Sequence, residues 1–231
     1  MAAKTLGLAA ALGLLLATAS AHAIPIAGTS GGSFSNVDNC TGFETCRING
    51  TVNGPATQVE WGYGLISGGS TLTAVDRVWN TSTDLDDFII AELVWTNLAT
   101  SDFRTPDLFT VDYTLTVNFT QPNGSSDSEL FNLRITNPTN PPGDRIAGMT
   151  LADLSNLSFS LNGVIISDIK YAVGGAGSFV NNIWKNPEGD TSRLYVTADF
   201  TAAQVPEPAA LGLVAGALLG AGVLSRRRRQ A

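Results

Sequence analysis

The segment from Val111 to Phe119 alternates apolar and polar side chains over its whole length, and this pattern constrains the fold more than any other feature. A period of two is typical of a β-strand with one buried face. It places Val111, Tyr113, Leu115, Val117 and Phe119 on that face. The chain therefore has at least one strand that needs a second apolar layer to cover it.

The other apolar runs also favour strands, and no stretch of the domain has the period of a helix. The dipeptide Asn162-Gly163 predicts a two-residue hairpin turn between strands at 157–161 and 164–169. Further strands are expected at 58–63, 71–75, 88–95, 130–136 and 194–200. About eight short strands with turns between them predict an all-β fold, an antiparallel β-sandwich of jelly-roll type over residues 57–204. The Gly-, Ser- and Asn-rich residues 24–56 are expected to form loop and short edge strand.

The N-terminal end, residues 1–23, has the layout of a signal peptide. Lys4 precedes an apolar run from Leu6 to Ala17 that is too short to span a bilayer. Small side chains in Ala21-His22-Ala23 suit a signal peptidase, so we expect cleavage after Ala23; a retained N-terminal anchor is the alternative. Cleavage removes the one histidine of the sequence and with it any Ser-His-Asp, Cys-His or histidine-zinc mechanism.

The C-terminal end, residues 205–229, joins three unlike elements in a fixed order. Val205-Pro206-Glu207-Pro208 is followed by the apolar run 209–224 and then by Arg226-Arg227-Arg228-Arg229. As a helix, 209–224 would be about 24 Å long, close to the ~30 Å of a hydrocarbon core, and it is expected to cross the membrane. The arginines should stay in the cytoplasm, which leaves the β domain outside. An ordinary tail anchor is the alternative.

This tail, Val205 to Arg229, resembles that of the PEP-CTERM proteins of Gram-negative bacteria. The resemblance implies export by the Sec machinery, removal of the signal by signal peptidase, and recognition by an exosortase, a membrane transpeptidase, near the Pro-Glu-Pro. It also implies a precursor anchored in the inner membrane and a mature form at the cell surface or outside the cell, often alongside exopolysaccharide.

A second, weaker resemblance covers the middle of the chain. The residues Val59-Glu60-Trp61-Gly62, the run from Phe88 to Asn97 and the hairpin from Leu115 to Arg134 are similar to the choice-of-anchor K domains. Trp95 stands where that family usually carries a histidine. The resemblance implies an extracellular module and carries no enzymatic chemistry with it.

The exported part, Ile24 to Gln204, is acidic and contains both cysteines. All but Glu207 of the 20 Asp and Glu lie there, whereas 5 of the 13 Lys and Arg lie outside, so 8 basic and 19 acidic residues give a net charge of −11. This charge argues against nucleic acid as a partner. Cys40 and Cys46 are expected to form a disulfide in an oxidising compartment; a pair of metal-binding or catalytic thiols is the alternative.

Two sets of side chains are candidate ligand sites. Asp84, Asp86 and Asp87 offer hard oxygen ligands of the kind that calcium takes, which makes calcium the one cofactor to consider; a solvated acidic turn is the alternative. Trp79 and Trp184 stand among Asn, Thr and Lys, so they are candidate surface rings for stacking on a glycan. Packing of these rings in the core is the alternative.

We expect no catalytic residues and a β domain that is a binding or a purely structural module. The alternative is an extracellular, carboxylate-dependent glycan hydrolase, for which Glu60, Asp76 and Glu92 are the candidates. A hydrolase requires two carboxyl groups that meet in a cleft with perturbed pKa values, whereas a binding module requires an exposed aromatic face.

Overall fold

The computed structural model describes residues 23–40, 46–49, 56–62, 68–100, 106–137 and 144–203. The described residues belong to one unit, Ala23–Ala203. The predicted sorting tail and all but the last residue of the predicted signal peptide lie outside them.

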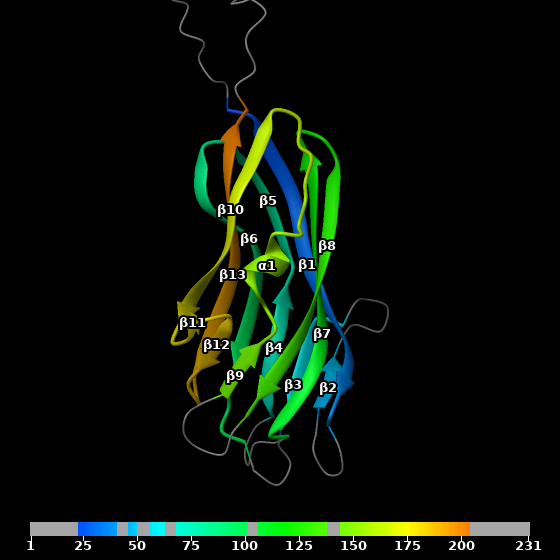
Figure 1. The fold of residues 1–231 in the computed structure, drawn as a ribbon, viewed down its shortest axis with the longest axis vertical. Helices are drawn as coiled ribbons and strands as arrows, with labels where there is room; N and C mark the ends of the chain where they lie inside the picture. Colours follow the sequence, from blue (N-terminus) through cyan, green and yellow to red (C-terminus); the bar gives the residue numbers. More distant parts are fainter. Residues whose placement is uncertain are drawn as a thin grey trace, which may run out of the picture. The chain divides into compact units, whose positions relative to one another are not determined.

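The unit consists of two sheets in which every strand pairing is antiparallel (Figure 1). One sheet has the order β11-β12-β9-β8-β7-β1-β5, with β1 (Pro25–Asp38), β5 (Arg77–Ser82), β7 (Leu108–Gln121), β8 (Ser125–Thr136), β9 (Asp144–Ala147), β11 (Ser178–Val180) and β12 (Ile183–Asn186). The other has the order β10-β13-β6-β4-β3-β2, with β2 (Cys46–Asn49), β3 (Gln58–Trp61), β4 (Ser70–Val75), β6 (Leu85–Thr96), β10 (Val164–Gly175) and β13 (Thr191–Ala202). The predicted all-β, two-sheet sandwich is confirmed.

Helix contributes little to the part of the chain that the structure describes. Its one helix there is α1 (Leu151–Leu154), where Thr150 and Asp153 form a capping box. No helix among the described residues is long and apolar enough to cross a membrane.

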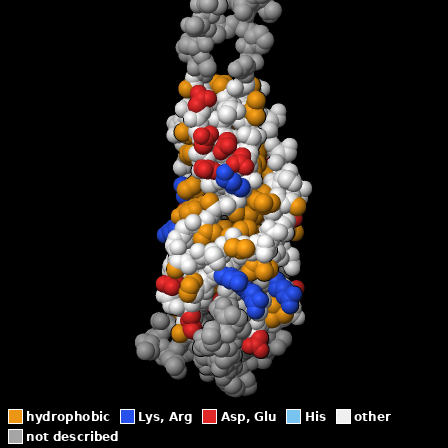
Figure 2. Space-filling view, turned by 60° about the vertical axis from the view of Figure 1, so that its left-hand side comes forward, with side chains coloured by type: hydrophobic (Ala, Val, Ile, Leu, Met, Phe, Trp, Pro, Cys, Tyr) orange, Lys and Arg blue, Asp and Glu red, His pale blue; other side chains and the backbone are white. Residues whose placement is uncertain are grey.

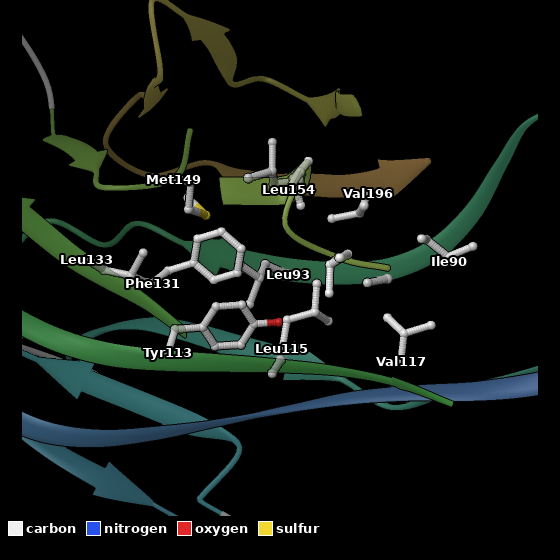
Figure 3. Packing of buried hydrophobic residues seen from close by; sticks show 14 of the residues in the cluster. Ile90, Leu93, Tyr113, Leu115, Val117, Phe131, Leu133, Met149, Leu154 and Val196 are labelled. Carbon is white, nitrogen blue, oxygen red and sulfur yellow. The ribbon is translucent and has the colours of Figure 1, made fainter. Parts of the chain in front are cut away.

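The core lies between the two sheets, and β7 supplies it in the predicted register. All five apolar residues of the Val111 to Phe119 alternation are buried. Figure 3 shows Tyr113 and Leu115 on one side of this layer, with Leu93 and Val196 facing them from β6 and β13. A cavity beside these side chains has a volume of about 10 Å³, which is no more than the space of one water molecule.

The expected short edge strand near the disulfide is β2, at one edge of its sheet. The expectation is wrong for residues 25–38, because β1 runs for 14 residues between β7 and β5. Glycine is what allows this strand to lie there. A Cβ at Gly28 would lie 2.6 Å from the Asn118 carbonyl oxygen and 2.7 Å from the Trp79 ring, and a Cβ at Gly32 would overlap the Tyr113 ring. The glycines therefore make space for aromatic rings of the core, and the sequence signs of a loop are here signs of close packing.

The first arm of the predicted hairpin at 157–161 is also not a strand. Only Leu161 forms a bridge, to Val164, and β10 pairs along its length with β13 instead. The backbone N–H of Ser158 and that of Ser160 donate to side chains of β8, Asp127 at 2.8 Å and Ser125 at 3.1 Å. These hydrogen bonds satisfy backbone N–H groups of the segment, although it does not pair with another strand along its length.

Both ends of the unit meet at the Asn162-Gly163 turn. The Ala203 N–H donates to the Gly163 carbonyl at 2.7 Å, and a Cβ at Gly163 would lie 3.0 Å from Ile24 Cδ1. The antiparallel register then places the last residues of β6, β8 and β12 and the first of β9 at the opposite end of the sandwich (Figure 1). We call these the Gly163 end and the Asp144 end.

Candidate functional site

Buried polar side chains gather at the Asp144 end. Ser70, Asn97, Asp144 and Asn186 are all buried there. Ser70 Oγ donates to Asn97 Oδ1 at 3.2 Å, and Asn97 Nδ2 donates to the Asn186 carbonyl at 2.9 Å. Because buried polar groups are costly unless they are paired, this network holds the ends of β4, β6 and β12 in one arrangement.

Asp144 is the acid of this network. Burial raises the pKa of its carboxyl to about 7; a hydrogen bond from Asn97 lowers that pKa, and repulsion from Glu188 raises it further. In the orientation that pairs donors with acceptors, the Asn137 amide nitrogen lies 2.6 Å from Asp144 Oδ1 and also donates to Oδ2. A carboxyl in this state can exchange a proton near neutral pH or bind a cation that compensates its charge.

A second group of acids lies on the outer face of the other sheet. Carboxylate oxygens of Asp87, Asp168 and Asp199 lie within 4.8 Å of one another. Two β-bulges bring them together, because Asp87 and Asp168 have φ of +53° and +50° at register shifts on either side of β13. Figure 2 shows acidic side chains gathered on this face beside a basic one.

Lys170 is the cation of this acidic group. Its Nζ lies 2.7 Å from Asp87 Oδ1 and 2.5 Å from Asp168 Oδ2, and these hydrogen bonds raise the pKa of Lys170. The three carboxylates are hard ligands, but a metal ion would have to displace the lysine ammonium. Of the predicted calcium residues, Asp87 belongs to this group, whereas Asp84 and Asp86 are exposed and belong to no such group of the described residues.

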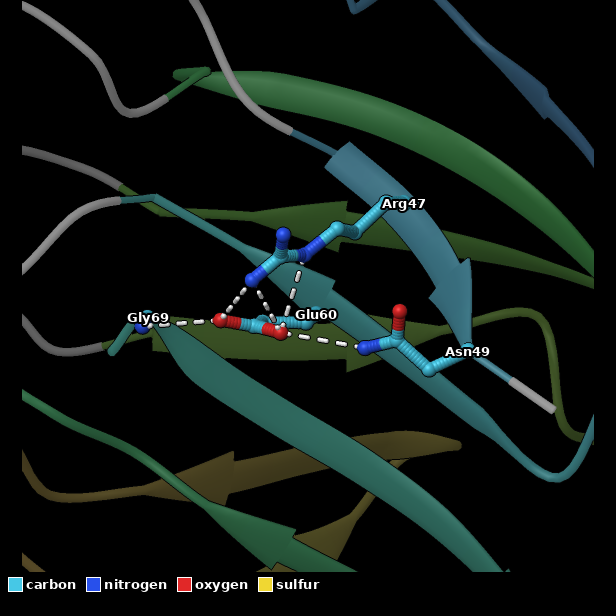
Figure 4. Close-up of polar contacts among 4 residues, drawn as sticks. All are labelled: Arg47, Asn49, Glu60 and Gly69. Atoms are coloured by element: carbon cyan, nitrogen blue, oxygen red, sulfur yellow. Dashed lines mark hydrogen bonds and ion pairs between the residues drawn. The ribbon is translucent and has the colours of Figure 1, made fainter. Parts of the chain in front are cut away.

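Glu60 on β3 is held by two residues of β2 and by Gly69, which precedes β4 (Figure 4). Arg47 donates to both of its carboxylate oxygens, and Asn49 and the Gly69 N–H each donate to one. The Arg47 hydrogen bond is the largest of the effects that lower the pKa of Glu60. This carboxylate is therefore ionised and fully hydrogen-bonded.

Glu92 on β6 is buried between two arginines. Arg77 Nη1 lies 2.6 Å from its Oε2, and Arg193 pairs with its Oε1. The Glu92 side chain is 6% exposed, against 33% for Arg77 and 47% for Arg193. The glutamates proposed for a hydrolase are thus each tied into an ion pair of their own.

The candidate surface rings Trp79 and Trp184 are packed in the core, which is the alternative that the sequence left open. Trp79 is 7% exposed and Trp184 is fully buried, and Trp184 Nε1 donates to Ser192 Oγ at 2.9 Å. The polar residues beside them in sequence misled the prediction, because neighbouring side chains of a strand point to opposite faces. Neither ring offers a surface on which a sugar could stack.

The predicted disulfide is confirmed. Cys40 and Cys46 are bonded, and their Cα atoms are 6.0 Å apart. The bond links the residues that follow β1 to the first residue of β2 and so joins the two sheets at the Asp144 end. The sorting-signal residues, Val205 to Pro208 and Arg226 to Arg229, lie outside the described residues.

Sequence reasoning missed the polar network at the Asp144 end and, apart from Asp87, the acidic group around Lys170. Asp168 interrupts an apolar run, which is a local sign of a bulge, and Asp199 is simply the outward residue of an alternating strand. Asn97 and Asn186 carry no local sign at all, because their partners are far away in sequence.

Comparison of the chain with protein-family profiles, with curated proteins and with solved structures gave no match. The likeness to the PEP-CTERM and choice-of-anchor K families therefore rests on the sequence motifs and stays a prediction.

Proposed function

We propose that this chain is an exported cell-surface or extracellular-matrix protein, sorted by an exosortase-type system through its C-terminal tail. Its β domain, a sandwich of jelly-roll type, is then a non-enzymatic binding or structural module. Residues 209–224 serve as the transmembrane helix of the precursor, and residues 1–23 serve as the export signal. Signal peptidase, the Sec machinery, the exosortase and surface exopolysaccharide are the partners in this proposal.

The observation that carries the proposal is the extent of the β unit. It begins at Ala23 and ends at Ala203, and its core is formed by residues between these limits. These limits coincide with the predicted cleavage after Ala23 and with the start of the tail at Val205. A domain that lies between an export signal and a sorting tail must fold from its own residues. The core of this unit is formed by such residues.

The position of the first and last residues of the β unit also fits presentation on a surface. Ile24 and Ala203 both lie against Gly163, so the tail leaves the domain from the Gly163 end. The Asp144 end, with its disulfide, is the end farthest along the strands from that exit. A disulfide that closes a short loop suits an oxidising compartment.

Deletion of Pro206 to Ala231 in the native host tests the sorting step. We expect the truncated protein to cross the inner membrane and to be lost from the membrane and cell-surface fractions to the soluble periplasm or the medium, because it lacks the sorting signal. Retention in the membrane and cell-surface fractions at the level of the full chain would contradict the proposal. A matched variant, Arg47→Ala, changes one exposed arginine of the β domain and should leave the location unchanged.

A further inference from the structure

Asp144 lies between two amide side chains on neighbouring strands. Its Cα partner on β12 is Asn186, so both side chains project from the same face, and both are buried. On the other side, the Asn137 amide follows β8 and approaches Asp144 Oδ1 to 2.6 Å. The Asn137 amide thus contacts the carboxylate, and the buried Asn186 side chain lies beside it on the neighbouring strand.

The Asn186 amide has a free acceptor. Its Nδ2 donates to the Trp95 carbonyl at 2.9 Å and to the Asp190 carbonyl at 3.1 Å, which fixes the orientation of the group. Its Oδ1 has no hydrogen-bond partner among the residues that the structure describes, although Asn186 is only 1% exposed. A buried acceptor without a donor is costly, and a bound cation or water removes that cost.

Asp144 also lacks a cationic partner. No Lys or Arg of the described residues forms an ion pair with it. Arg145, the next residue of β9, points to the opposite face of the sheet because side chains alternate along a strand. Glu188 adds a second negative charge nearby, which disfavours the ionised form of Asp144 still more.

We propose that Asp144, Asn137 and Asn186 form a calcium-binding site. Two carboxylate oxygens and two amide oxygens are hard donors, and calcium accepts six to eight such ligands in flexible geometry, with water filling the rest. Magnesium requires a regular octahedron of shorter bonds, which fits four donors on adjacent strands less well. Without the ion, the Asn137 amide nitrogen donates to the Asp144 carboxylate, so calcium binding requires the amide to turn its oxygen to the ion by rotation about its terminal bond.

Calcium at this site would link the ends of β8, β9 and β12 in addition to the backbone hydrogen bonds between these strands. It would compensate the charge of Asp144 and complete the hydrogen-bonding capacity of Asn186 at the same time. The affinity expected for a site with one carboxylate is that of extracellular modules, with Kd of about 0.1–1 mM.

The test is a calcium titration of the purified full chain, with thermal unfolding and isothermal calorimetry as readouts. In about 5 mM calcium chloride we expect Tm to rise by at least ~2 °C over the EDTA sample, with a smaller rise in magnesium. D144N should abolish both the shift and the binding heat. N137A, at a half-buried position, serves as a second variant and should weaken binding about tenfold or more.

D168N is the matched control, because it removes an exposed carboxylate of the Asp87, Asp168 and Asp199 group and leaves Asp144 intact. It should keep the full calcium response. The proposal is overturned if the native chain shows no calcium response, if D144N and N137A respond as the native chain does, or if D168N alone loses the response. The first outcome would indicate that a water molecule satisfies Asn186.

Discussion

Asp144 and Asn186 face each other across the β9–β12 ladder, and both side chains are buried at the end of the sandwich opposite to Gly163. In this pair, an acid whose pKa burial raises to about 7 stands opposite a residue whose amide oxygen has no partner among the described residues. The stability of this end should therefore depend on pH and on cations.

The pH dependence follows from the sign of the Asp144 shift. Its folded pKa of about 7 lies above that of an unfolded aspartate, about 3.9. Because the pKa of Asp144 is higher in the folded state, protonation of this carboxyl stabilises the fold fully below about pH 4. This stabilisation is lost as the pH rises through 7. Without calcium, we expect the free energy of unfolding of the native chain to fall over this range by up to about 4 kcal/mol.

D144N should remove this dependence, because an amide does not titrate. Urea unfolding in EDTA at about pH 5 and about pH 8 compares the two proteins. A fall of the same size in D144N would show that another group is responsible. D168N, at an exposed position, should behave as the native chain does.

The packing of β1 predicts a large effect of one methyl group. G28A places a Cβ against the Asn118 carbonyl and the Trp79 ring, so overpacking should lower the free energy of unfolding by about 1–3 kcal/mol. G124A is the matched control, because a Cβ there would meet nothing within 4 Å. If both variants unfold at the same urea concentration as the native chain, the close approach of β1 to its neighbours is not a packing constraint.

The ion pairs of Glu92 should be coupled. Either R77A or R193A leaves one arginine beside the buried carboxylate. Each should therefore lower the free energy of unfolding by only about 1 kcal/mol, because the arginines are partly exposed and solvent weakens their ion pairs. The double variant leaves Glu92 buried and unpaired and should cost about 3 kcal/mol, more than the sum. A double-mutant cycle measures this coupling, and strict additivity would contradict it.

Sequence predicts those parts of this fold that depend on local periodicity. The strand at Val111 to Phe119 is clear because its buried and exposed residues alternate without interruption. Alternation does not place Trp79 in the same way, because Arg77 and Thr81 share its face of β5 whereas the apolar Val78 lies on the exposed face. Tertiary packing therefore decides that this ring is buried.

The Asp144 site could not be predicted in this way. Its carboxylate, the Asn97 that donates to it and the Asn186 beside it come from three strand ends that are far apart in the sequence, 89 residues in the case of Asn97 and Asn186. Only the pairing of β9 with β12 brings these residues together, and that pairing is set by tertiary packing.

The location and the first residue of the mature protein test the central claim most directly. Cells of the native host are treated with a protease that does not cross the outer membrane, and the protein is followed by immunoblotting; a surface fraction of untreated cells is used for N-terminal sequencing. We predict that the protein is accessible to the protease and that it begins at Ile24. Recovery of a protected, cytoplasmic chain that still begins at Met1 would contradict the account.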